Sequence, residues 1–259
     1  MRNKPIGIFD SGIGGTSIFK EIHALLPNES CIYLADSKNA PYGNRSEDEI
    51  IQLSIKNTEF LINKGCKIIV VACNTATTNA IEYLRKNYDI PFIGIEPAIK
   101  PAALNTQTKV IGILATKGTL SSHLFHKTTD LYSKEIKIIE QVGEGIVPLI
   151  ETGQLDSEAM RSHLETYLEP MLRQNIDYLV LGCTHYPYLI PMLTKMLPDN
   201  VKIIDSGRAV AKQTQSVLTT LNFLNDSIEK PSIQLFSNGD ITVLNSILDY
   251  NFNVSYLDF

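Results

Sequence analysis

Short runs of apolar, largely β-branched residues alternate along the chain with longer stretches in which apolar residues recur every three or four positions. The run at residues 68–72 (IIVVA) has no polar face, which is typical of a strand in a sheet that helices cover on both sides. Strands that alternate with helices predict an α/β fold with mainly parallel sheets. The predicted strands lie at residues 6–10, 31–36, 68–73, 92–96, 110–115, 136–142, 178–183, 201–205, 233–237 and 253–257.

A weak internal repeat divides the chain into two related halves. Residues 6–12 (IGIFDSG) are similar to residues 111–118 (IGILATKG), and residues 69–75 (IVVACNT) are similar to residues 179–185 (LVLGCTH). We therefore expect two pseudo-symmetric α/β domains, with the active site in the cleft between them at the carboxyl ends of the strands.

The domain boundaries are expected near Glu96-Pro97 and Ser206-Gly207. Residues 1–97 together with 208–259 then form the first α/β domain, and residues 98–207 form the second. A helical stripe made by Val210, Thr214, Val217, Leu221 and Leu224 predicts that the helix after the second boundary packs back on the first half.

Composition and charge narrow the class of protein. Of the 259 residues 44% are hydrophobic and 20% charged, which is ordinary for a soluble globular enzyme. No stretch approaches the roughly 20 apolar residues that span a bilayer, and the first apolar run is too short for a signal peptide. A net charge of −5 without basic runs makes nucleic acid and anionic membrane poor partners. We expect a cytoplasmic protein that acts on a small molecule.

The four cysteines form no C-x-x-C pair, so neither a metal site nor a dithiol redox motif is predicted. Cys31 and Cys66 lie at strand edges without polar neighbours and are interpreted as buried free thiols. Cys73 and Cys183 differ, because each ends a predicted strand and precedes a predicted helix start. Asn74 and Thr184 are expected to cap these helices, and the helix N-termini are expected to make both thiols more acidic.

Because two such turns occur in matching places of a repeat, a catalytic role for Cys73 and Cys183 is favoured over a role in packing alone. Two thiols near one ligand indicate either a disulfide or proton transfer, and Cys73 and Cys183 are far apart in sequence. Racemisation explains the duplication, because one thiolate removes the α-proton while the opposite thiol supplies another on the other face. The reaction runs both ways, so the two groups must be chemically alike.

Three further turns carry polar residues. The glycine-rich residues 10–15 (DSGIGG), with Asp36 after the next strand, invite a dinucleotide-binding interpretation, but Ser17 stands where that fingerprint requires glycine. These glycines are better explained by a small anion approaching the backbone. Residues 41–43 (PYG) are either a solvated loop or a lip that holds a carboxylate through backbone N–H groups. Glu151, taken alone, is expected to be solvated.

Together these motifs resemble those of the bacterial glutamate racemase family within the aspartate/glutamate racemases. The resemblance rests on residues 10–15, 41–43, 73–75 and 182–187 (GCTHYP), which follow the family's order and spacing over nearly the whole chain. The resemblance implies two α/β domains, an interdomain site, no cofactor, and D-glutamate supply for peptidoglycan and hence for cell shape. Residues 37–40 differ from the commonest family versions.

The resemblance also implies roles for individual residues. Cys73 takes the α-proton from D-glutamate and Cys183 takes it from L-glutamate, with Asp10 assisting Cys73, and Glu151 and His185 assisting Cys183. The residues implied to bind the substrate are Asp10, Ser11, Tyr42, Gly43, Asn74, Thr75, Thr184 and His185. A family member that acts on aspartate or another amino acid is the alternative, and the sequence leaves open whether the protein is a homodimer.

Overall fold

The computed structural model describes residues 1–227 and 229–259. Its strands form a six-stranded sheet of order β10-β9-β2-β1-β3-β4 and a four-stranded sheet of order β6-β5-β7-β8, and all neighbouring strands are parallel. The strands are β1 (Ile6–Asp10), β2 (Cys31–Ala35), β3 (Ile68–Val71), β4 (Phe92–Gly94), β5 (Val110–Ala115), β6 (Lys137–Val142), β7 (Tyr178–Gly182), β8 (Lys202–Ile204), β9 (Ile233–Ser237) and β10 (Val254–Tyr256).

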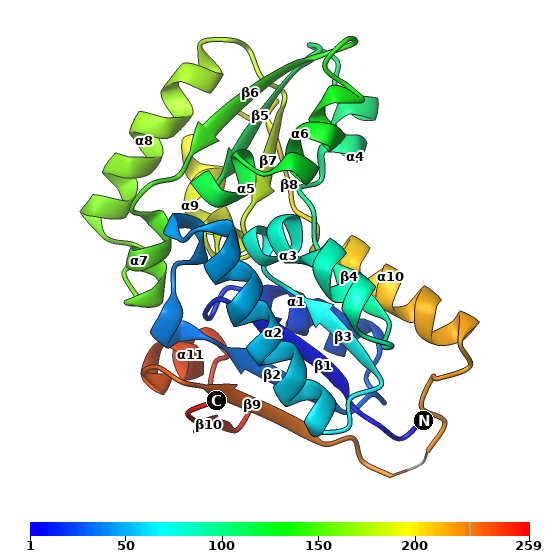
Figure 1. Cartoon of the computed structure of the whole chain (residues 1–259). Coiled ribbons are helices and arrows are strands. Elements are labelled where there is room, and N and C mark those ends of the chain that lie inside the picture. Colours follow the sequence, from blue (N-terminus) through cyan, green and yellow to red (C-terminus); the bar gives the residue numbers. More distant parts are fainter. Residues whose placement is uncertain (228) are drawn as a thin grey trace.

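Helices cover both sheets, and the chain forms two lobes (Figure 1). The first lobe consists of the six-stranded sheet with α1 (Thr16–Leu25), α2 (Glu47–Asn63), α3 (Asn74–Asn87), α10 (Gly207–Thr220), α11 (Ile241–Ile247) and the 3-10 turns η1 (Ser37–Asn39) and η2 (Tyr42–Asn44). The second lobe consists of the four-stranded sheet with α4 (Ile99–Asn105), α5 (Lys117–Leu120), α6 (His123–Asp130), α7 (Ile146–Glu151), α8 (Glu158–Leu172), α9 (Ile190–Met196) and the 3-10 turn η3 (Tyr186–Leu189).

The internal repeat is visible in the strand order. The segment β2-β1-β3-β4 of the first sheet has the same order as β6-β5-β7-β8 of the second, and β9 and β10 extend the first sheet beyond β2. In each lobe the two repeated strands lie side by side, because Phe9 pairs with Val71 and Ala115 pairs with Gly182. Both cysteine turns therefore follow a central strand at the carboxyl edge of a parallel sheet, where ligands bind in such folds.

The structure confirms the α/β class with parallel sheets and places every strand within the predicted range, at most two residues shorter than predicted. The strands agree because a segment buried on both faces must be apolar throughout its length. Strands from 6–94 and 233–256 make one sheet and strands from 110–204 make the other. The exact domain boundaries at residues 97 and 207 stay a prediction.

Helix α10 packs against α1 in the first lobe, as predicted, but the predicted stripe is wrong at its end. The helix stops at Thr220, so Leu224 lies beyond it, and Leu221 is 42% exposed. Val210, Thr214 and Leu218 are the positions that face the core. The spacing of apolar residues predicted a longer helix, because it does not mark where a helix ends. It also did not distinguish Val217 from Leu218, the neighbouring residue that is buried.

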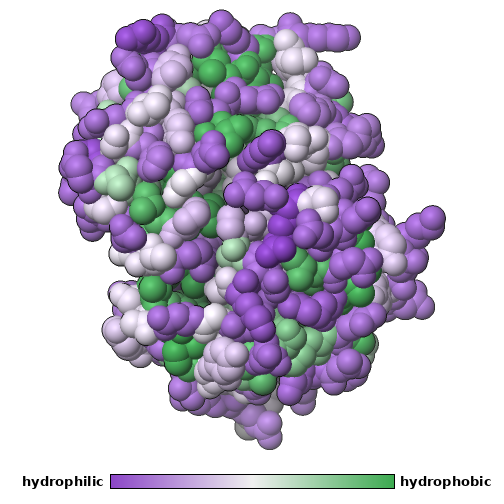
Figure 2. All heavy atoms as spheres, turned by 60° about the vertical axis from the view of Figure 1, so that its left-hand side comes forward, coloured by the Kyte–Doolittle hydropathy of each residue, from purple (hydrophilic) through white to green (hydrophobic). Residues whose placement is uncertain are grey.

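One cluster of buried apolar side chains runs through both lobes and includes Ile13 of the first and Ile146 of the second. The space-filling view shows mostly polar side chains with scattered apolar patches, and a narrowing between the lobes (Figure 2). In the part of the chain that the structure describes, no helix combines the length and apolar character needed to cross a membrane.

Candidate active site

Both cysteine turns open into one small cavity between the lobes. The cavity is narrow, so only a small molecule suits it. Cys73 reaches it from the end of β3 and Cys183 from the end of β7, and both side chains are at most 7% exposed. The cavity is lined by Ser11, Pro41, Tyr42, Gly43, Cys73, Asn74, Thr75, Thr116, Val147, Cys183, Thr184 and His185.

The structure therefore brings together the predicted substrate-binding residues except Asp10, which lies directly behind the cavity wall. Asp10 is fully buried, and its carboxylate accepts hydrogen bonds from the Gly12 backbone N–H (3.1 Å) and from the Thr184 hydroxyl (3.1 Å). The bond to Thr184 joins the two lobes. Asp10 therefore fixes a cavity-lining residue of the opposite lobe.

Cys73 caps helix α3 itself, which corrects the prediction that Asn74 is the cap. The Cys73 sulfur accepts from the Ala76 N–H (3.4 Å), and its thiol donates to the Ser11 hydroxyl (3.6 Å). The amide oxygen and nitrogen of Asn74 are both buried and have no protein partner. Because unpartnered buried amides are costly, this side chain is available to a bound ligand.

The expectation of an acidic Cys73 thiol is wrong in this structure. Burial, and after it the negative charge of Asp10, raise the pKa of Cys73 well above its ordinary value. The hydrogen bonds from Ala76 and to Ser11 act in the opposite direction but are weaker. The helix N-terminus cannot offset the loss of solvent around the thiolate.

Cys183 has a different environment. Its sulfur lies 3.7 Å from Nδ1 of His185, and Nε2 of His185 lies 2.5 Å from the Glu151 carboxylate. Burial lowers the pKa of His185, but hydrogen bonds and charge interactions with Cys183 and Glu151 outweigh it and raise the pKa well above its ordinary value. His185 therefore tends to carry a positive charge beside the Cys183 sulfur. Thr184 is not a cap, because the turn η3 begins after His185.

Glu151 joins the lobes and is not solvated, which corrects the interpretation of this residue taken alone. Its side chain is 14% exposed and comes from α7 of the second lobe. In the first lobe it accepts hydrogen bonds from the Ile13 backbone N–H (2.8 Å) and the Ser37 hydroxyl (3.2 Å). Ser37 lies in the stretch to which the sequence assigned no role.

The glycines of residues 10–15 permit this contact. A Cβ atom on Gly12 would lie 1.9 Å from a Glu151 carboxylate oxygen, and one on Gly14 would lie 2.2 Å from the His185 ring. The anion that approaches this backbone is thus a side chain of the protein itself, where the sequence predicted a small anionic ligand. A side chain larger than hydrogen would displace Glu151 at position 12 or the His185 ring at position 14.

Asp10→Asn is expected to flatten the pH dependence of stability. Burial raises the pKa of Asp10 from 3.8 to about 6, so the folded protein holds this proton more tightly than the unfolded chain. Protonated Asp10 therefore contributes to the free energy of unfolding. This contribution is fully present below about pH 4 and is lost as the pH rises through 6, a change of roughly 3 kcal/mol. Urea unfolding of both proteins at pH 4.5 and pH 7.5 measures it. A difference between them that does not change with pH contradicts the expectation.

The other two cysteines contribute to packing. Burial raises the pKa of Cys31 and of Cys66 to about 12, and neither side chain lines the interlobe cavity. Cys66 lies against Gly7 of β1, and Cys31 donates to the Glu29 carbonyl (3.7 Å). Among the described residues no group of three or more His, Cys, Asp or Glu side chains is arranged to hold a metal ion.

Sequence reasoning missed three residues of the cavity wall, Pro41, Thr116 and Val147. Thr116 shares a hydrogen bond with Thr75 across the lobes (2.8 Å between the hydroxyl oxygens). The internal repeat contained a signal for it, because Thr116 follows β5 as Ser11 follows β1. Val147 carries no chemical signal and is recognised through its position on α7 alone.

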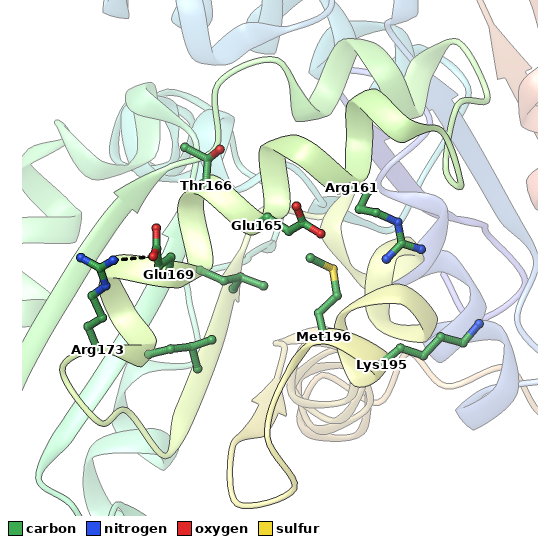
Figure 3. A pocket seen from close by; sticks show the side chains of 9 residues that line it. Arg161, Glu165, Thr166, Glu169, Arg173, Lys195 and Met196 are labelled. Atoms are coloured by element: carbon green, nitrogen blue, oxygen red, sulfur yellow. Dashed lines mark hydrogen bonds and ion pairs between the residues drawn. The ribbon is translucent and has the colours of Figure 1, made fainter.

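A wider and more open hollow lies on the outer side of the second lobe, between α8 and α9 (Figure 3). Charged side chains of both signs surround it, among them Arg161, Glu165 and Lys195, and Arg173 forms an exposed ion pair with Glu169 (2.6 Å). It contains neither cysteine, and its exposed charges are well solvated. The chemistry of the molecule is concentrated in the interlobe cavity.

Comparison with known proteins agrees with this geometry. A family model described as Asp/Glu/Hydantoin racemase matches residues 6–214. A glutamate racemase of Herpetosiphon aurantiacus is 44% identical over 240 residues, which cover 93% of this chain and 94% of that protein.

Two solved structures share the whole fold. A glutamate racemase isoform of Bacillus anthracis has a TM-score of 0.88 and 30% identity, with 100% of this chain and 98% of that chain covered. The Escherichia coli glutamate racemase, in complex with L-glutamate and the activator UDP-MurNAc-ala, has a TM-score of 0.86 and 32% identity, with 98% and 97% covered. The family model spans both cysteine turns and most of both lobes, so the chain belongs to the Asp/Glu/Hydantoin racemase family.

Proposed function

We propose that this isomerase interconverts L- and D-glutamate by direct proton transfer at Cα, with Cys73 and Cys183 as the two acid–base groups and without a cofactor. The observation that carries the proposal is that both thiols, from corresponding strands of two similar lobes, line one enclosed cavity. The curated relatives that the chain matches over most of its length are glutamate racemases. D-glutamate made in this way serves peptidoglycan synthesis.

The proton balance of the reaction accounts for both thiols. From D-glutamate, a Cys73 thiolate removes the α-proton and a Cys183 thiol donates its own to the opposite face, which leaves Cys73 as thiol and Cys183 as thiolate. From L-glutamate the same groups act in the reverse order. Each turnover therefore interchanges the protonation states of the two thiols, and proton exchange restores the starting form.

The neighbours of the two thiols favour different protonation states. His185, held by Glu151, stabilises a thiolate on Cys183. On the other side, the charge of Asp10 disfavours the thiolate of Cys73. The ammonium group of a bound amino acid brings a positive charge into the cavity and favours that thiolate.

The remaining cavity residues are suited to an amino acid with two carboxylates. Asn74, with its unpartnered amide, is proposed to bind the α-carboxylate together with Thr75 and Thr184. The backbone N–H groups of Tyr42 and Gly43, on the separate turn η2, are proposed to bind the γ-carboxylate. Ser11, Asp10 and His185 complete the site around the reacting carbon.

Solvent-deuterium incorporation tests the proposal. In D₂O each glutamate enantiomer is expected to yield the opposite enantiomer with deuterium at Cα, because the proton it gains comes from a thiol that exchanges with solvent. Extensively dialysed enzyme is expected to keep full activity. Product that retains the original α-hydrogen, or turnover of aspartate in place of glutamate, contradicts the proposal.

A further inference from the structure

Asp36 is a buried carboxylate that the mechanism does not use. It follows β2, is fully buried, and does not line the cavity. Its oxygen Oδ2 accepts a hydrogen bond from the Tyr42 hydroxyl (2.5 Å). Its oxygen Oδ1 accepts from Asn39 (2.8 Å), from Lys56 (3.1 Å) and from Asn238 (2.5 Å).

Both carboxylate oxygens of Asp36 accept hydrogen bonds, three at Oδ1 and one at Oδ2. Three amide or hydroxyl groups and one ammonium group converge on Asp36, and a carboxylate accepts all of them. The donors come from η1, η2, α2 and the end of β9, which are separate segments of the first lobe. Asp36 thus joins four segments at one point behind the turn that carries Tyr42 and Gly43.

The Tyr42 hydroxyl is fully committed to this network. It donates to Asp36 and accepts from the Asn57 side chain (3.1 Å), so the hydroxyl has no donor left for a carboxylate ligand. Tyr42 is 1% exposed, yet Tyr42 and Gly43 line the cavity. The hydroxyl therefore anchors the turn, and the rest of the turn faces the ligand.

Asn238 holds the same region from the far end of the sequence. In addition to the bond from its side-chain nitrogen to Asp36, the side-chain oxygen of Asn238 accepts from the Lys38 backbone N–H (2.9 Å). The backbone N–H of Asn238 donates to the Ala35 carbonyl (3.3 Å). The strand β9, added beyond the repeated part of the sheet, thereby contacts the loop that leads from β2 to Tyr42.

We propose that Asp36 is a positioning residue that, through the Tyr42 hydroxyl and with Asn238, sets the Tyr42-Gly43 turn for the distal carboxylate of the substrate. This inference rests on the proposed glutamate racemase activity. It assigns Asp36 an effect on substrate affinity and none on proton transfer, because Asp36 reaches neither cysteine. The distal carboxylate is common to both enantiomers, so both are affected alike.

The test is the isosteric variant Asp36→Asn, which replaces one acceptor oxygen by a donor and removes the charge. KM is expected to rise on the order of ten-fold for both enantiomers, with kcat and its primary deuterium isotope effect changed by less than about two-fold. The matched control is Asp177→Asn, because Asp177 is a buried carboxylate of the second lobe that accepts from Thr106 (2.6 Å) and two backbone N–H groups. This control is expected to lower Tm and leave KM unchanged.

Tyr42→Phe is a second variant that tests the same proposal, and it can be measured even if Asp36→Asn does not fold. Removing the hydroxyl is expected to raise KM by a similar factor, and Asp36→Asn is expected to add little in that background. An unchanged KM in both single variants overturns the proposal, as does a full additional rise in the double variant. Inactivity of the wild-type protein toward glutamate would instead refute the proposed function.

Discussion

Cys73→Ser and Cys183→Ser are each expected to abolish racemisation, with kcat lowered on the order of 10³-fold or more. Serine is nearly isosteric with cysteine, so the fold is expected to persist, but its hydroxyl is far less acidic than a thiol. Each variant keeps one thiol, which still exchanges the α-proton of one enantiomer without inversion. Cys73→Ser is expected to retain deuterium exchange into L-glutamate, and Cys183→Ser into D-glutamate, as NMR in D₂O can measure.

The matched controls are Cys31→Ser and Cys66→Ser. Both residues are buried away from the cavity, so these variants are expected to remain active with at most a modest loss of stability. A Cys73→Ser or Cys183→Ser variant with near-native racemisation would sink the two-base scheme. Exchange of the opposite enantiomer in each variant would leave the scheme standing and reverse the assignment of the two faces.

Glutamate is expected to exceed both aspartate and glutamine in kcat/KM by at least about 100-fold. Tyr42 and Gly43 lie on a different turn from Asn74, so the cavity offers separate groups to two carboxylates. Aspartate is one methylene too short to reach both, and glutamine has the length but no distal charge. The loss of charge-assisted hydrogen bonds to a buried anion costs about 1.5–3 kcal/mol each.

Steady-state constants for both enantiomers of all three amino acids measure this discrimination. Because enantiomers have equal free energy in water, kcat/KM must be the same in both directions for each amino acid, which provides an internal check. Comparable kcat/KM values for glutamate and aspartate would place the chain among racemases of another substrate and would remove the assigned role of the Tyr42-Gly43 turn.

The strands and the cysteine pair could be predicted from the sequence because their signals are local. A strand buried on both faces must be apolar over its whole length, as residues 68–72 are. The repeat placed Cys73 and Cys183 after corresponding strands, and parallel strands bring such turns to the same edge of a sheet. The sequence thus determined the fold class and the two cysteine turns that meet at the cavity.

The tertiary structure decided the environment of each side chain. Glu151 looked solvated in isolation, but it contacts Ile13 from 138 positions away and orients His185. The helix N-terminus predicted an acidic Cys73, but burial and Asp10 raise its pKa. In the sequence Asp36 had no role once the dinucleotide-binding interpretation had been rejected, and only folding brings Tyr42 and Asn238 to its carboxylate. The physical reason is that solvation and charge interactions depend on residues brought together by folding, and spacing along the chain carries no record of them.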